Sequence, residues 1–97
     1  MKEIGLKPQL ISEIRALAQK YQLDRVILFG SRARGDYRET SDIDLASSGG
    51  NGERFALDVD EYTATLLKYD VVNLDGAVQQ ELRDAIDREG LVLYEKV

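Results

Sequence analysis

The stretch FGSRARGDYRETSDIDL, residues 29–45, decides the fold because it joins two predicted strands. It also contains most of the residues that could carry out chemistry. Just before it, the apolar run RVILF (residues 25–29) is typical of a strand buried on both faces. At its far end, DIDLA (residues 42–46) alternates polar and apolar residues and predicts a second, short strand. We expect a short helical turn after Gly30. Residues 33–41 are then a spacer that lets the two strands lie side by side.

Toward the N-terminus, KPQLISEIRALAQKYQL (residues 7–23) predicts a helix, with Pro8 suited to its first turn. Its apolar residues recur at helical spacing: Leu10, Ile14, Leu17, Ala18 and Tyr21. After the second strand, SSGGNG (residues 47–52) is expected to be a loop, because its composition does not support a regular element.

Further along, residues 53–68 predict a helix whose inward face would contain Phe55, Val59, Tyr62 and Leu66. DVVNL (residues 70–74) predicts a third strand, and LVLY (residues 91–94) a fourth. Between them, residues 77–88 predict a helix that stops at Gly90. The inward face of that helix would contain Val78, Leu82, Ala85 and Ile86.

This order of elements predicts an α/β (α+β) protein with a small mixed sheet of about four strands. Helices would pack mainly on one face of the sheet. The loop lengths leave the order of the strands open. The chain of 97 residues is long enough for one small domain and too short for two, so we expect residues 1–97 to form a single domain.

The composition excludes several kinds of chemistry. The chain has no cysteine and no histidine, which rules out thiol catalysis, histidine metal ligands and the Ser-His-Asp arrangement. The formal net charge of −5 argues against direct binding of nucleic acid, which usually needs a basic surface. The only basic cluster, Arg32, Arg34 and Arg38, is large enough to hold a few phosphates. No segment is apolar for long enough to cross a bilayer, so we expect a cytoplasmic protein with no membrane contact.

Asp42 and Asp44 are the first candidate site residues. Residues i and i+2 of a strand face the same side, so their carboxylates would lie close together and repel each other. Oxygen-only ligands of this kind suit Mg²⁺ or Mn²⁺, with waters and substrate phosphates completing the shell. The alternative is a solvated strand face.

Gly30 and Ser31 directly follow a predicted buried strand. A glycine there lets a phosphate approach the backbone, and the serine hydroxyl can donate to it. The alternative is an ordinary turn at the end of a strand. Arg32 or Arg34 could reach a phosphate oxygen through the planar guanidinium, or could be a solvated surface charge.

Asp70 opens the third predicted strand. If that strand lies beside residues 42–46, Asp70 completes a carboxylate triad that can hold two metal ions. Asp70 could instead be a turn residue. Asp58 and Asp60 are rival third acids that we disfavour as helical, and Asp75 is a rival that we disfavour as too near a turn.

These residues carry a resemblance to a known family. GSRARGDYRETSDIDLA and the ending REGLVLYEK resemble the minimal nucleotidyltransferases of the DNA polymerase beta superfamily. The resemblance implies a palm-like fold and covers most of the chain. It implies that Gly30 and Ser31 hold the β,γ-phosphates of a nucleotide and that Asp42 and Asp44 bind Mg²⁺. Asp70 would bind the catalytic metal and help to deprotonate the acceptor.

The resemblance also implies an activity: Mg²⁺-dependent transfer of AMP from ATP to a hydroxyl, expected to be a tyrosine, of a partner HEPN ribonuclease toxin. The chain would then be the antitoxin of a HEPN/MNT toxin–antitoxin pair. A non-catalytic antitoxin that masks its partner by stoichiometric binding is the alternative. One departure stands out. In relatives the second strand continues apolar past the position of Ala46, whereas residues 47–52 here predict a break and a mobile wall beside the site. The alternative is an ordinary flexible connection.

Overall fold

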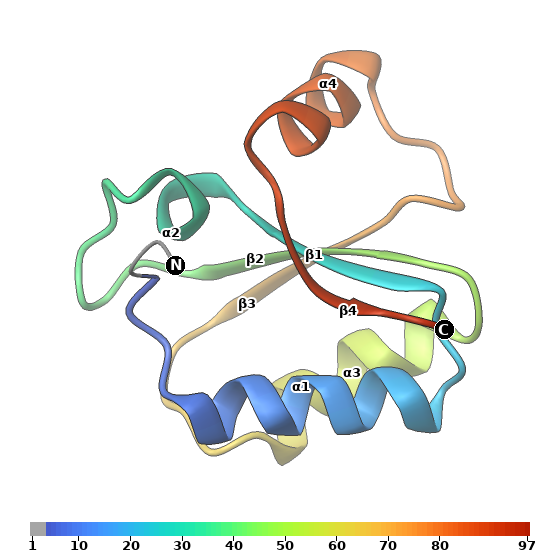
Figure 1. The fold of residues 1–97 in the computed structure, drawn as a ribbon, viewed down its shortest axis with the longest axis horizontal. Helices are drawn as coiled ribbons and strands as arrows, with labels where there is room; N and C mark the ends of the chain where they lie inside the picture. The colour runs from blue at the N-terminus through green and yellow to red at the C-terminus, as the bar shows by residue number, and fades with distance from the viewer. Residues whose placement is uncertain (1–3) are drawn as a thin grey trace.

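The structure is a computed structural model that describes residues 4–97, and within them it contains four helices and one four-stranded sheet (Figure 1). In chain order the elements are α1 (Pro8–Lys20), β1 (Arg25–Phe29), α2 (Gly30–Arg34), β2 (Ile43–Ser48), α3 (Gly52–Tyr62), β3 (Tyr69–Asn73), α4 (Gln80–Glu89) and β4 (Leu91–Glu95). No helix in this described range is long and apolar enough to cross a membrane.

The sheet is mixed, as predicted, and its strand order is β3-β2-β1-β4. β1 pairs antiparallel with both β2 and β4, whereas β2 pairs parallel with β3. As a consequence, β1 ends at the same edge of the sheet at which β2 and β3 begin. The turn after β1 and the first residues of β2 and β3 therefore gather in one place.

Helices cover both faces of this sheet (Figure 1). The two longer helices, α1 and α3, share one face, where they bury Ile14 and Phe55 against the main core. α4 lies on the opposite face, where Ile86 packs against a smaller core cluster formed with Ile27, Phe29 and Ala46. Because β1 is covered on both faces, all four residues from 26 to 29 are buried, as the apolar run predicted.

The prediction that residues 47–52 form a loop was wrong at both ends. β2 continues through Ser48, and α3 begins at Gly52, so only residues 49–51 connect them. Ser47 is fully buried, pairs with Val26 in the sheet and accepts a hydrogen bond from the Leu74 N–H through its carbonyl. The strand therefore does not break after Ala46, and the connection that follows it is shorter than predicted.

The prediction of a helix over residues 53–68 was wrong in its second half. α3 ends at Tyr62, and Thr63 is extended with its hydroxyl donating to the Val59 carbonyl. Of the predicted inward face, Phe55 and Val59 are buried, but Tyr62 is 63% exposed and Leu66 fully exposed. Periodicity alone did not predict this end, because the Ala64 N–H donates to the Glu13 carboxylate, a contact set by the tertiary fold.

The last predicted helix is confirmed with shifted bounds. α4 begins at Gln80 instead of residue 77, so Val78 precedes the helix, and it ends at Glu89 just before Gly90. Ile86 is buried, and Leu82 packs against the same cluster. The short helical turn expected after Gly30 is α2.

Candidate active site

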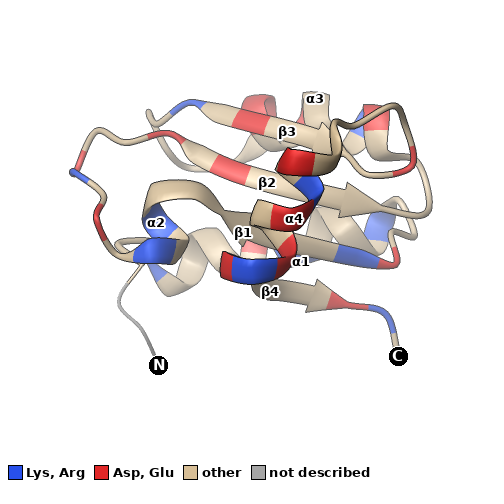
Figure 2. Ribbon diagram, turned by 90° about the horizontal axis from the view of Figure 1, so that it is seen from above, with Lys and Arg blue, Asp and Glu red and all other residues tan. Residues whose placement is uncertain are grey.

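Asp44 and Asp70 are direct neighbours in the sheet. The parallel register of β2 and β3 pairs them, and neighbouring strands lie about 4.8 Å apart. Asp44 alternates with Ala46, and Asp70 with Val72, so both carboxylates belong to the face that α4 covers. Figure 2 shows these acidic segments of β2 and β3 side by side, next to the basic α2. The predicted condition for an acidic cluster, that the third strand lies beside the second, is met.

Asp42 lies just ahead of β2, two residues before Asp44, and its side chain is exposed. The Ile43 N–H donates to the Lys68 carbonyl, and this bond starts the contact between the two parallel strands directly after Asp42. All three predicted acids, Asp42, Asp44 and Asp70, therefore belong to the edge of the sheet where β2 and β3 begin.

The turn at Gly30 packs directly against Asp44. Gly30 has a left-handed φ of +75°, a conformation that residues with a side chain rarely adopt. A Cβ atom at this position would collide with the Asp44 Oδ2 atom. Ser31 follows in the first turn of α2 and is half-buried. The structure thus brings the predicted phosphate-binding turn and the predicted metal ligand into contact.

The charge distribution at this edge disfavours ionisation of Asp44. Burial raises the pKa of the Asp44 carboxyl above its usual range, and the nearby charges of Asp70 and Asp42 raise it further. Arg34 acts in the opposite direction. A carboxylate held in this way gains stability from a cation, because a cation relieves the repulsion among the three acids.

Arg34 lies at the rim of this cluster. Its Nη1 atom is 3.2 Å from Glu89 Oε1, and its Nε atom is 3.3 Å from Asp36 Oδ2. The guanidinium is half-exposed and can exchange these partners for a phosphate. Sequence reasoning missed Glu89, the last residue of α4, because only the packing of α4 across the sheet brings it beside residues of α2.

Arg32 does not lie where the sequence prediction needs it. Its side chain is buried, with 1% exposed, and its guanidinium donates to backbone carbonyls instead of facing the acidic cluster. The ring of Tyr37 stacks on it at 4.9 Å. A guanidinium engaged in this way is not free for a phosphate, so of the two arginines only Arg34 remains a candidate phosphate ligand.

The rival acids have other roles. Asp58 is buried on α3, accepts a hydrogen bond from the Tyr21 hydroxyl and pairs with Arg54 at 3.4 Å. Asp60 is an exposed residue of the same helix, which covers the opposite face of the sheet from Asp44. Asp75 lies beyond the far end of β3 and accepts a hydrogen bond from the Gly49 N–H. The choice of Asp70 as the third acid therefore agrees with the geometry.

The donor set at this edge is made of carboxylate oxygens, which hard cations such as Mg²⁺ prefer. Within residues 4–97, no three acidic side chains already converge as a metal cage. That arrangement suits Mg²⁺, which usually takes one or two carboxylates and completes its shell with waters and substrate phosphates. Asp42, Asp44 and Asp70 therefore fit an ion that arrives together with a phosphate.

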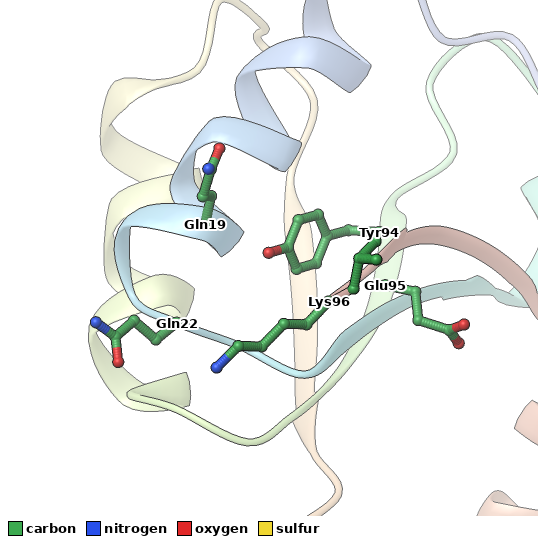
Figure 3. Close-up of a pocket in the computed structure, with 6 residues that line it drawn as sticks. Gln19, Gln22, Tyr94, Glu95 and Lys96 are labelled. Carbon is green, nitrogen blue, oxygen red and sulfur yellow. The ribbon is translucent and has the colours of Figure 1, made fainter.

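A cavity of about 530 Å³ elsewhere on the surface is unrelated to this cluster. Gln19 and Gln22, near the end of α1, line it together with Tyr94, Glu95 and Lys96 (Figure 3). Since Glu95 pairs with Arg25 at the start of β1, the cavity lies at the opposite end of β1 from Gly30. None of the predicted site residues lines it.

The fold and the acidic edge together define a class of protein. It is a small α/β domain in which carboxylates of neighbouring strands lie beside a glycine turn, an arrangement typical of domains that bind nucleotide phosphates. A family model described as "Polymerase beta, Nucleotidyltransferase" matches residues 12–97. The chain therefore belongs to the polymerase beta nucleotidyltransferase family, and the resemblance seen in the sequence is confirmed.

Several known proteins are similar to this chain. MJ0604 of Methanocaldococcus jannaschii, named as a candidate protein adenylyltransferase, is 43% identical over 70 residues, which cover 70% of this chain and 67% of MJ0604. A solved structure of a candidate minimal nucleotidyltransferase is 29% identical with a TM-score of 0.65, covering 84% of this chain and 86% of the other.

Two toxin–antitoxin structures share the fold at lower identity. A toxin–antitoxin complex with AMP-PNP has a TM-score of 0.70 at 24% identity, and the match covers 89% of this chain and 73% of the other. A Shewanella oneidensis complex of a tri-AMPylated HEPN toxin with its MNT antitoxin has a TM-score of 0.63 at 22% identity, covering 90% and 71% of the two chains.

Proposed function

We propose that this chain is an Mg²⁺-dependent nucleotidyltransferase that transfers AMP from ATP to a hydroxyl of a HEPN-type partner protein and thereby acts as its antitoxin. The observation that carries the proposal is the direct pairing of Asp44 with Asp70 beside Gly30. Family membership supports it, as do the names of the relatives, which refer to protein adenylyltransferase and to an AMPylated HEPN toxin. Residues 1–97 act as a single cytoplasmic catalytic domain.

In this proposal the turn after β1 holds the nucleotide. Because Gly30 has no Cβ, the β,γ-phosphates approach the backbone closely, and the Ser31 hydroxyl donates to a phosphate oxygen. Arg34 turns from Glu89 toward the phosphates, since its guanidinium suits a phosphate at least as well as a carboxylate. Arg32 has no part in binding the nucleotide.

Asp42, Asp44 and Asp70 would hold Mg²⁺ or Mn²⁺, which when bound neutralises charge on the reacting phosphate oxygens. Asp70 is exposed and accepts the proton of the incoming hydroxyl. The acceptor oxygen then forms a bond to the α-phosphorus in line with the bond to the β-phosphate, which breaks and releases pyrophosphate. The protein mainly positions these groups and stabilises the transition state electrostatically.

The acceptor belongs to a protein in this proposal because the chain has a net charge of −5 and only a small basic cluster, which argues against a nucleic acid. We propose a tyrosine hydroxyl on a helical HEPN-type toxin. Both assignments rest on the family resemblance and on the complexes that relatives form.

The proposal is tested by incubating the purified chain and partner with ATP labelled on the α-phosphate, in the presence of Mg²⁺ or Mn²⁺. We expect label on the partner with wild type and none with Asp42→Ala or Asp44→Ala. Asp60→Asn is the matched control, because Asp60 is an exposed aspartate on α3, away from the acidic cluster. It should leave the transfer unchanged.

Two outcomes would contradict the proposal in different ways. No transfer by wild type, with the partner still neutralised by both alanine variants, would establish stoichiometric masking as the function instead. No rise in the melting temperature with millimolar Mg²⁺-ATP would count against a nucleotide site altogether, since a ligand that binds only the folded state must stabilise it.

A further inference from the structure

Arg32 is the only charged side chain with 1% exposure or less among the described residues. None of the ion pairs found in residues 4–97 includes it. A buried charge is costly unless its environment satisfies it, so the position of Arg32 requires an explanation. Its location offers one, because Arg32 belongs to α2, directly after the Gly30–Ser31 turn.

Backbone carbonyls satisfy the guanidinium. It donates to five of them, which come from two separate segments: Ile4 at 3.1 Å, Gly5 at 3.3 Å, Arg38 at 3.5 Å, Glu39 at 3.1 Å and Ser41 at 3.0 Å. Its Nε atom donates to the Ser41 carbonyl as well, at 3.2 Å. One side chain therefore binds the loop ahead of β2 and the segment ahead of α1 to the short helix α2.

The loop that Arg32 holds leads directly to the metal-binding acids of the proposed site. Ser41, which accepts two of the hydrogen bonds, is the residue before Asp42. Asp44 is fixed within the ladder of β2, but Asp42 precedes the strand and depends on its neighbours for position. Since α2 also carries Gly30 and Ser31, Arg32 joins the two halves of the site.

We propose that Arg32 is a positioning residue that fixes Asp42 relative to the Gly30–Ser31 turn. This inference rests on the proposed function, because the group that it positions is a metal ligand of that function. A lysine cannot substitute, since an ammonium is a single point with three donors, whereas the planar guanidinium has five donors in a fixed fork. Arg32→Lys therefore keeps the charge and removes most of the tether.

The first test is independent of activity. Glu39 is exposed, and its carbonyl is one of the tethered acceptors, so a glutamate-specific protease reports on the bond between Glu39 and Thr40. We expect this bond to be cut at least about tenfold faster in Arg32→Lys, because several charge-assisted hydrogen bonds are lost. Cleavage after Glu53 and Glu61 should not change. Arg38→Lys, the same substitution at an exposed arginine of the same loop, is the control and should match wild type.

Equal cleavage of wild type and Arg32→Lys at residue 39 would overturn the tether. If Arg32→Lys does not fold cooperatively, hydrogen exchange of the Arg32 Nε–H in wild type, followed by NMR, replaces it, since this group donates to the Ser41 carbonyl. We expect this exchange to be at least about tenfold slower than that of the Nε–H of the exposed Arg38, and equal exchange at the two arginines would overturn the tether.

The second test measures the consequence for Asp42. In the label-transfer assay, the Mg²⁺ concentration for half-maximal rate should rise about tenfold or more in Arg32→Lys and stay unchanged in Arg38→Lys. An active wild type with an unchanged Mg²⁺ dependence in Arg32→Lys would overturn the positioning role. An inactive wild type would instead remove the proposed function, while the protease test would still decide whether Arg32 holds the loop.

Discussion

Replacing Gly30 with alanine should damage the site more than the fold. The φ of +75° at Gly30 is left-handed, and a residue with a Cβ loses about 1–2 kcal/mol there. The new methyl group would also collide with the Asp44 carboxylate, which must swing away. Displacements of about 1 Å in a reacting group can lower a rate about 100-fold. We therefore expect a loss of about 1–2 kcal/mol in the free energy of unfolding and about a 100-fold slower transfer.

Gly35→Ala is the matched control for this prediction. Gly35 ends α2 with a left-handed φ of +95°, so alanine there has a similar backbone penalty. Urea unfolding should show comparable losses for the two variants, whereas label transfer and stabilisation by Mg²⁺-ATP should fall only for Gly30→Ala. Wild-type transfer by Gly30→Ala, or an equal loss of transfer in Gly35→Ala, would refute the claim that Gly30 keeps space for Asp44.

Three further predictions concern Asp44, Glu89 and Asn51. Folding raises the pKa of the Asp44 carboxyl, so the protonated form of Asp44 stabilises the folded state in acid. This contribution to the free energy of unfolding is lost as the pH rises through the pKa that Asp44 has in the folded state. Asp44→Asn should therefore abolish transfer and yet be more stable than wild type near neutrality, with the difference shrinking in mild acid, as urea unfolding across pH would show. Glu89→Gln should lower the pKa of the Asp44 carboxyl, measured by NMR titration, because the charge of Glu89 helps to raise it; an unchanged titration would contradict this. Asn51→Ala should reduce the free energy of unfolding by about 1 kcal/mol, since the Asn51 side chain caps α3 by accepting from the Arg54 N–H, and transfer should be unaffected.

The parts of the site that lie close in sequence were predictable. The two-residue period of a strand predicts that Asp42 and Asp44 face the same side. The position of Gly30 directly after an apolar run predicts a turn at the end of a buried strand. Asp70 was predictable only on the condition that its strand lies beside β2. The register that pairs Asp44 with Asp70 depends on the parallel connection through α3, and loop lengths do not determine it.

Arg32 shows what local reasoning cannot provide. In the sequence it is one of three arginines in a basic cluster, with the same claim on a phosphate as Arg34. Its actual partners include the carbonyl of Ile4, 28 residues away, and carbonyls carry no sequence signal because every residue has one. Similarly, the composition of Ser47 and Ser48 predicts a loop, but both residues belong to β2, and tertiary packing buries Ser47.

Three unusual features of this chain lie within residues 30–44. Gly30 holds a left-handed backbone against a carboxylate, Asp44 is ionised less readily than an ordinary aspartate, and Arg32 is buried with no acidic partner among the ion pairs of the described residues. A partly buried carboxylate that its neighbours repel is typical of a functional site, because the rest of the fold must compensate for it. A protein that only masks its partner has no use for the Asp44 repulsion, and a change such as Asp44→Asn would relieve it and stabilise the domain. The presence of this mutually repelling acidic edge therefore favours catalysis over masking.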